Sequence, residues 1–236
     1  MSATETSPSI YTTGEYAREN PSYHVEDSAW KARHILRMIH KHNLQPRRIC
    51  EVGCGAGEIL NVLQQSLPGD AEFDGYEISP QAFALCQERA NQRLRFHRVS
   101  LPPEEIPAFD LLLCIDVFEH VPDYIGFLKA LQGKASRTIF HVPLDLSVQS
   151  VLRSSPIMNT RKTFGHLHYF TRETALATLA DCGYDVIDSF HTAVGVERGR
   201  GLKSLLAKWP RKILASLNQN LAARLLGGHS LLVLAK

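Results

Sequence analysis

The 236-residue sequence lacks the features that mark several classes of protein. None of its five cysteines forms a Cys-x-x-Cys pair, which favours reduced thiols over a disulfide framework. No apolar run is long enough to span a bilayer, and residues 1–9 lack the basic and apolar regions of a signal peptide. We therefore expect a cytoplasmic protein.

Strong net charge, internal repeats and a long linker are also missing. The formal net charge is +2, and hydrophobic residues make up 44% of the chain against 21% charged residues. This balance is typical of a globular protein with an apolar core, and the length suits one domain. We expect that domain over residues 28–236, after a tail at residues 1–27.

Strand-like and helix-like segments alternate along the chain. The expected strands are 47–53, 72–78, 94–99, 110–116, 138–142, 184–190 and 230–235. The expected helices are 29–42, 58–67, 80–90, 122–131 and 171–182. Alternation of this kind predicts an α/β fold with a Rossmann-like, seven-stranded, mostly parallel and doubly wound sheet. A long segment precedes the last strand, so we expect a helical insertion there.

The most informative segment is 51–58, with the sequence EVGCGAGE, between the first strand and the first helix. Its glycines permit a tight turn and the close approach of a ligand to the backbone. Glu51 and Glu58 flank the loop and would repel a pyrophosphate. They suit a ligand with a cationic group, such as an amino acid ammonium or a sulfonium.

Glu77 is the second signal, because it ends the second expected strand. A carboxylate at this position can accept hydrogen bonds from both hydroxyls of a ribose. The glycine loop and Glu77 together favour a nucleoside-containing cofactor over a plain turn and a solvated acid.

With these residues the sequence resembles the class I S-adenosylmethionine (SAM)-dependent methyltransferases. The resemblance extends over EVGCGAGE (51–58), GYEIS (75–79), FDLLLCIDVFEHVPD (109–123), HLHYFT (166–171) and LADCGYDV (179–186). The branch it resembles contains O-methyltransferases of ubiquinone biosynthesis and methyltransferases of sugars and natural products.

The resemblance implies a role for each matching residue. Gly53, Cys54, Gly55 and Gly57 would border the methionine part of SAM, and Glu51 would lie near its ammonium. Glu77 would bind the ribose. The remaining cofactor contacts would come from Ile78 and Leu101 near the adenine, Ser100 at a position where the family often has an acid, and Ile115 with Asp116 near the methyl group.

Methyl transfer to a hydroxyl benefits from a base, and the chain offers several histidines. His120 and His166 are the candidate catalytic residues, with His141 and His168 as further possibilities. Asp116, Glu119 and His120 form a D-x-x-E-H pattern to which His166 or His168 can add a ligand, so Mg²⁺ is a less favoured alternative.

Two terminal regions leave alternatives open. The tyrosines of residues 1–27 form either a lid over the cofactor or part of a disordered tail. Residues 197–226 are basic and amphipathic, and they form a helical cap over the acceptor, a contact with an anionic membrane, or both.

The leading hypothesis is O-methylation of a small-molecule hydroxyl (a sugar, a quinol or a natural product) with S-adenosylhomocysteine (SAH) as co-product. The alternatives are a metal-assisted RNA 2′-O-methyltransferase and a SAM-binding partner protein without catalysis. A nucleic-acid partner is disfavoured because no RNA-binding module is visible. The sequence predicts neither the acceptor nor the oligomeric state.

Overall fold

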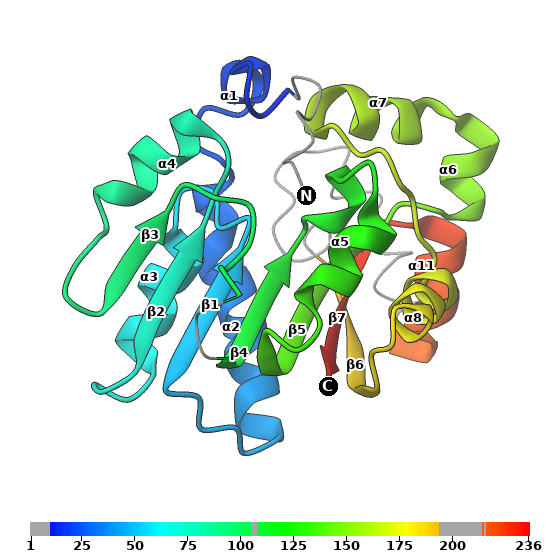
Figure 1. The fold of residues 1–236 in the computed structure, drawn as a ribbon. Coiled ribbons are helices and arrows are strands. Elements are labelled where there is room, and N and C mark those ends of the chain that lie inside the picture. Colours follow the sequence, from blue (N-terminus) through cyan, green and yellow to red (C-terminus); the bar gives the residue numbers. More distant parts are fainter. Residues whose placement is uncertain (1–9, 105–107, 194–213, 215) are drawn as a thin grey trace. The chain divides into compact units, whose positions relative to one another are not determined.

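Seven strands form one sheet in the computed structural model, which describes residues 10–104, 108–193, 214 and 216–236 (Figure 1). Their order is β3-β2-β1-β4-β5-β7-β6. The strands are β1 (Arg48–Val52), β2 (Glu72–Tyr76), β3 (Leu94–His97), β4 (Phe109–Ile115), β5 (Ala135–Leu144), β6 (Val186–Thr192) and β7 (His229–Ala235). This architecture confirms the expected Rossmann-like α/β fold.

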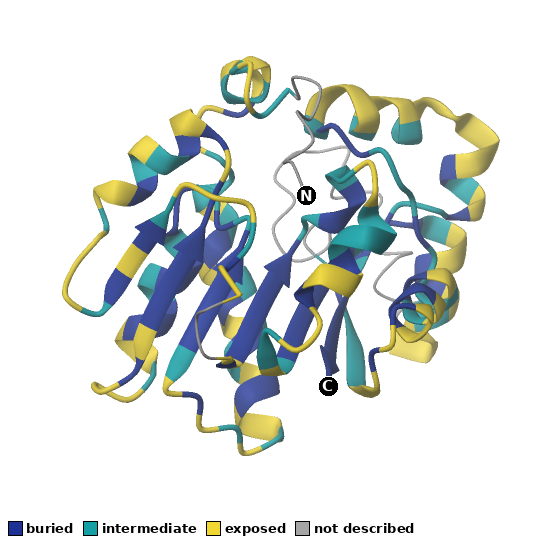
Figure 2. Ribbon diagram, viewed as in Figure 1, coloured by how far each residue is buried: buried dark blue, intermediate teal, exposed yellow. Residues whose placement is uncertain are grey.

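Strand direction follows from how the chain connects the strands. β1, β2 and β3 pair in parallel with helices between them, whereas β7 is antiparallel to both β5 and β6. β4 and β7 have buried side chains on both faces, as apolar central strands should (Figure 2). Parallel strands place their carboxyl ends at one edge of a sheet, and the loops at that edge position ligands in such folds.

Contacts divide the chain into two compact units. The first unit comprises Met1–Leu113 and Thr163–Gly165, and the second comprises Cys114–Lys162 and His166–Lys236. The expected tail at residues 1–9 and most of the basic insertion, residues 197–213 and 215, lie outside the described part of the chain.

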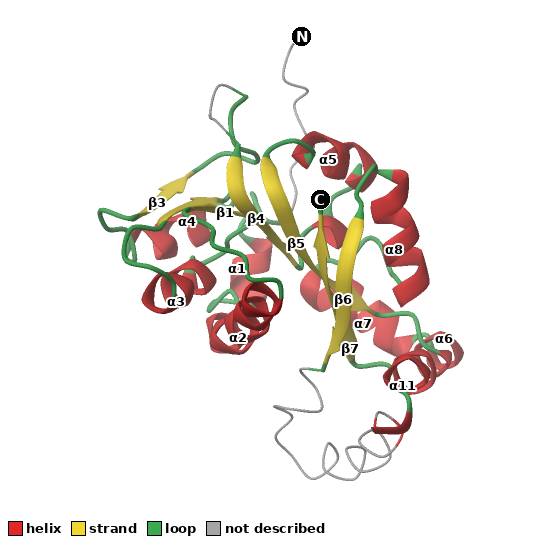
Figure 3. Cartoon of the chain, turned by 90° about the horizontal axis from the view of Figure 1, so that it is seen from below, coloured by secondary structure: helices red, strands yellow, loops and turns green. Residues whose placement is uncertain are grey.

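Four helices lie in the described part of the first unit, and α2 and α3 are side by side on one face of the strands (Figure 3). They are α1 (Glu15–Glu19), α2 (Val25–Lys41), α3 (Glu58–Ser66) and α4 (Pro80–Gln87). α2 begins before the expected start at Ala29, with Asp27 in its first turn and not at its cap. Acidic side chains in a first turn stabilise the helix through its dipole, which allows this earlier start.

The second unit contains the 3₁₀ turn η1 (Phe118–His120) and five described helices, with α5 and α8 side by side (Figure 3). These are α5 (Tyr124–Leu131), α6 (Val148–Arg153), α7 (Ser155–Phe164), α8 (Arg172–Asp181) and α11 (Gln219–Leu226). The sequence pattern had not predicted α6 and α7. Ser147 and Ser150 form a capping box that starts α6, and two serines in a short polar segment are a weak signal.

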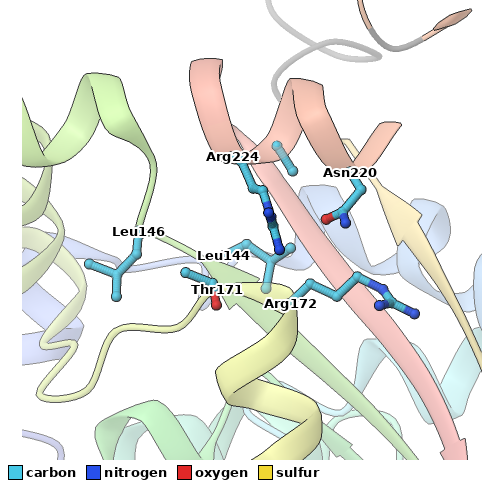
Figure 4. A pocket seen from close by; sticks show the side chains of 7 residues that line it. Leu144, Leu146, Thr171, Arg172, Asn220 and Arg224 are labelled. Atoms are coloured by element: carbon cyan, nitrogen blue, oxygen red, sulfur yellow. The ribbon is translucent and has the colours of Figure 1, made fainter. Parts of the chain in front are cut away.

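A shallow depression in the second unit lies where α11 packs beside β5 and α8 (Figure 4). Arg224 and Asn220 extend from α11, and both bond to Glu173, at 2.8 and 3.3 Å. The depression is lined by Leu144, Leu146, Thr171, Arg172, Asn220, Ala223 and Arg224. The depression is too narrow to hold an organic substrate. The bonds from Arg224 and Asn220 to Glu173 instead anchor α11 there.

Among the helices of the described residues, none combines the length and the apolar character needed to cross a membrane.

His191 of β6 makes the stability of the second unit sensitive to acid. Burial, then His229 and Arg172, lower its pKa to about 4, below about 6.5 for an unfolded chain. As the pH falls from about 6.5 to 4, His191 binds a proton in the unfolded chain but stays unprotonated in the folded protein. We therefore expect the free energy of unfolding to decrease by less than about 1.4 kcal/mol per pH unit from this half-buried group.

Chemical denaturation of wild type and His191→Gln across this pH range measures the effect. The variant should lose less stability on acidification, whereas the exposed His40→Gln should follow the wild type. Parallel curves for wild type and His191→Gln would refute the assignment.

Candidate functional site

The loop after β1 turns through three glycines in the left-handed conformation. The φ angles of Gly53, Gly55 and Gly57 are 71°, 55° and 77°. The amides of Gly53 and Cys54 both donate to the carbonyl oxygen of Tyr76 at the end of β2, at 2.8 and 3.1 Å. The loop is therefore held against the neighbouring strand before α3 begins.

Gly57 shows why this loop requires glycine. A Cβ atom there would lie 2.5 Å from Cζ of Phe96, and the φ angle is unfavourable for any residue with a side chain. The same backbone position is the N-cap of α3, whose free N–H groups favour electronegative ligand atoms.

Glu77 joins the glycine loop to the loop after β2. Its Oε2 accepts a hydrogen bond from the amide of Gly55 at 2.8 Å, and its Oε1 accepts one from the amide of Ser79 at 2.7 Å. Burial raises the pKa of Glu77, and the backbone hydrogen bonds oppose that shift. The carboxylate is fixed in orientation and keeps lone pairs that can accept further hydrogen bonds.

Glu51 is the second-last residue of β1 and is buried, with 1% of its surface exposed. Its Oε2 has no hydrogen-bond partner within the described part of the chain. Burial raises the pKa of Glu51 well above its ordinary value, Lys31 opposes this, and Glu77 adds to it. A buried acid without a partner costs free energy unless a ligand supplies a donor, so this residue fits a ligand ammonium.

The other predicted cofactor contacts occupy less restrictive positions. Ile78 and Ser100 are exposed, and Leu101 is half-buried. An exposed apolar Ile78 next to Glu77 is suited to stacking on a flat ring. Ile115 is buried at the end of β4, and its role toward a cofactor stays a prediction.

Aromatic residues of the N-terminal segment reach the same loops of the first unit. The hydroxyl of Tyr23 lies 2.8 Å from Oγ of Ser79, and its Cβ is 3.9 Å from the position that a Cβ of Gly55 would take. The ring of Tyr16 makes tilted contacts with those of Tyr11 and Tyr23, with ring centroids 4.8 and 5.4 Å away. The described part of this segment therefore packs against the loops after β1 and β2.

In the second unit, η1 brings both predicted catalytic histidines together. The rings of His120 and His166 lie 4.7 Å apart, and one ligand atom each of Glu119, His120 and His166 lies within 4.8 Å of the others. The amides of Leu167 and His168 donate to the carbonyl oxygen of Glu119 at 2.8 and 3.0 Å. These bonds attach the loop that carries His166 to the 3₁₀ turn.

His166 has a partner that sequence reasoning missed. Its Nδ1 lies 2.6 Å from Oδ2 of Asp145, just beyond the end of β5. A carboxylate on Nδ1 fixes the orientation of the His166 ring, and Nε2 is the ring atom suited to act as a base or as a metal ligand. An acid directly after an apolar strand was the one available signal for Asp145.

His168, by contrast, has a bracing role. Its Nε2 lies 3.0 Å from the carbonyl oxygen of Val121. It is not among the residues whose ligand atoms cluster with His166.

The position of Asp116 does not fit the role of metal ligand that the D-x-x-E-H pattern suggests. Its Oδ1 lies 2.6 Å from Nδ1 of His141, and Nε2 of His141 lies 2.8 Å from Oγ1 of Thr192. Asp116 is not among the residues whose ligand atoms cluster with His166. The physical reason is the backbone conformation of Asp116. Its φ angle of 54° is unusual for a residue with a side chain and goes together with the pairing of its carboxylate with His141.

Comparisons with known proteins show the family to which the chain belongs. The family model described as "Methyltransferase domain" matches residues 24–189. A ubiquinone biosynthesis O-methyltransferase of Paracidovorax citrulli is 30% identical over 94 residues, which are 37% of this chain and 38% of that protein. A tRNA U34 carboxymethyltransferase of Sulfurimonas denitrificans is 26% identical over 109 residues, 44% of this chain and 37% of that protein.

Among solved structures, magnesium protoporphyrin IX methyltransferase from Synechocystis with bound SAH has a TM-score of 0.62 and 14% identity. The match covers 96% of this chain and 95% of that one. At this identity it shows the fold alone. Because the family model matches more than half of the chain, the protein belongs to the methyltransferase-domain family of SAM-dependent enzymes.

Glu51→Gln separates stability from cofactor binding. The unfolded chain loses the Glu51 proton near pH 4.3, whereas the folded protein holds it to a higher pH. Raising the pH above about 4.3 therefore destabilises the cofactor-free protein, and the substitution should raise its melting temperature at pH 7.5. Loss of the charge should weaken SAH binding about tenfold.

Thermal unfolding with and without SAH tests both effects. The exposed Glu88→Gln is the matched control and should change neither quantity. A variant that binds SAH as tightly as the wild type would exclude Glu51 as the ammonium ligand.

Proposed function

We propose that this protein transfers the methyl group of SAM to a hydroxyl oxygen of a small molecule. The observation that carries the proposal is the loop of the first unit with its three left-handed glycines. Beside it lie Glu51, whose buried Oε2 has no hydrogen-bond partner among the described residues, and Glu77, which accepts the amide of Gly55. One acid suits the ammonium and the other suits the ribose hydroxyls of SAM. A phosphate-binding loop would not place buried acids beside its backbone amides.

The proposed roles follow from the positions of the residues. The backbone of Gly53, Cys54, Gly55 and Gly57 borders the methionine part of the cofactor. Ile78 packs on the adenine, with Ser100 and Leu101 at its edge. SAM supplies the electrophilic methyl group, so the protein needs to align the acceptor and exclude water.

The N-terminal segment is proposed to close over the cofactor as a lid. Tyr23 supports this, because its hydroxyl bonds Ser79, whose amide in turn donates to Glu77. A side chain at this position restricts the route by which solvent reaches the ribose site.

Deprotonation of the acceptor is assigned to the histidines of the second unit. Asp145 on Nδ1 orients His166, and His120 packs against it. The acceptor oxygen bonds the methyl carbon as the sulfur–carbon bond breaks, and its proton passes to His166. The choice of oxygen is supported by the names of the ubiquinone-biosynthesis relatives, of which the chain matches about two fifths to a half.

A divalent cation is a second possibility for the same cluster. Glu119, His120 and His166 offer one carboxylate and two imidazoles, a set that suits Mn²⁺ or Zn²⁺ better than Mg²⁺. The cation would polarise the acceptor oxygen, and Asp145 would orient His166 toward it.

Calorimetry with SAH tests the cofactor assignment. The wild type should bind at micromolar concentrations, Glu77→Ala should lose binding, and Tyr23→Phe should weaken it a few-fold because one hydrogen bond is lost. Glu72→Ala, at the exposed start of β2, is the control.

Labelled SAM with quinols, sugars and phenols in one set, and tRNA in another, then tests the acceptor class. A wild type that fails to bind SAH would overturn the proposal, whereas label in tRNA alone would replace the small molecule by RNA.

Titration of the metal-depleted protein with Mn²⁺, followed by electron paramagnetic resonance, tests the cation. Bound Mn²⁺ should be seen in the wild type, and Asp145→Asn should weaken it about tenfold by removing the group that orients His166. His40→Gln is the control. If the wild type leaves all Mn²⁺ free, His166 acts without a metal.

A further inference from the structure

Large apolar side chains are exposed mainly on one part of the second unit. Seven of the eleven large exposed hydrophobic residues within the described ranges belong to the segments 148–158 and 217–225. They are Val148, Val151, Leu152, Met158, Leu217, Leu221 and Leu225. Leu152 and Leu217 are 81% and 79% exposed, so they are nearly as open as in an unfolded chain.

The helices of this region bury small residues and expose large ones. Ser150 is the buried residue of α6, and Ala222 and Ala223 are those of α11. On α6, Val148, Val151 and Leu152 share one face at helical spacing. On α11, Leu221 and Leu225 share one face, and the exposed Leu217 precedes Asn218, the extended N-cap residue of the helix. An amphipathic helix in water has the opposite arrangement, so these faces have a use other than packing in the core.

The two helices lie side by side. Figures 1 and 3 both show α6 next to α11, and Figure 2 shows that most residues of α6 and α7 are exposed. The closeness is direct at one end, because a Cβ on Gly227, which ends α11, would lie 2.8 Å from Oγ of Ser147, which caps α6. We call α6, α7 and residues 216–226 the α6–α11 surface.

Charges on this surface have one sign. Residues 146–165 and 216–228 contain Arg153, Arg161, Lys162 and Arg224 and no acidic residue. Arg224 is paired with Glu173 of α8, whereas Arg153, Arg161 and Lys162 are exposed. Exposed leucine and valine rows with basic residues at their edge match a bilayer of anionic lipids, whose headgroups are negative and whose acyl chains begin just below them.

We propose that the α6–α11 surface docks on an anionic lipid membrane, with Leu152 and Leu217 entering the acyl region. The sequence pattern left membrane contact through residues 197–226 as an alternative to a helical cap over the acceptor. The described residues add α6 and α7, which lie outside that segment. This inference is independent of the proposed methyl transfer, since SAH binding in the first unit does not depend on it.

Flotation of the full chain with lipid vesicles tests the proposal. At low salt the protein should float with vesicles that contain phosphatidylglycerol and should stay behind with pure phosphatidylcholine. Leu152→Ser should reduce the bound fraction about tenfold, because an exposed leucine no longer enters the acyl region. Arg161→Glu should reduce it further at low salt and remove most of its salt dependence.

Matched controls lie away from the surface. Ile187→Ser removes another exposed apolar residue, and Arg98→Glu reverses another exposed charge. Both should float like the wild type, and SAH titration should show that all four variants are folded. Failure of the wild type to bind anionic vesicles, or equal losses in the controls, would overturn the proposal.

Discussion

The Glu77 carboxylate holds the loops after β1 and β2 in place, and the geometry of the first unit depends on it. One of its oxygens fixes the amide of Gly55 after β1, and the other fixes the amide of Ser79 before α4. These two loops are adjacent because β1 and β2 are neighbouring parallel strands, paired in register from Arg48 and Glu72 onward. Through Ser79 the same group reaches Tyr23 of the N-terminal segment. A single buried acid thus connects three stretches of chain that the sequence separates.

The second unit uses buried polar pairs for a similar purpose. His141 on β5 reaches Thr192 on β6, although β7 lies between these strands in the sheet. Its other nitrogen holds Asp116 after β4. His166 and Asp145 form a second pair, from a loop and the end of β5. Each pair satisfies groups that would be costly to bury alone, and each fixes the orientation of a side chain at the end of a strand.

Much of the fold could be predicted because local patterns and their positions in the sheet agreed. The apolar segment that became β4 is buried on both faces, and Pro80 after Ser79 begins α4 with the serine as its cap. Helix boundaries were predicted less accurately where several residues in a row can act as the N-cap. An example is α2, which starts at Val25, before the expected capping residues. The helices α6 and α7 were missed because they are short and expose their apolar residues, so the usual periodicity does not indicate them.

The sequence by itself determined the family, the glycine loop and the position of Glu77, because these depend on the order of residues around one strand–turn–helix unit and one neighbouring strand end. Only the tertiary structure decided that Asp145 pairs with His166 and that Asp116 pairs with His141 and not with the cluster around Glu119. Only the structure, too, placed the leucines of α6 and α11 on an exposed surface. The reason is physical: these arrangements join residues far apart in the chain, and the order β5-β7-β6 that brings many of them together arises from packing.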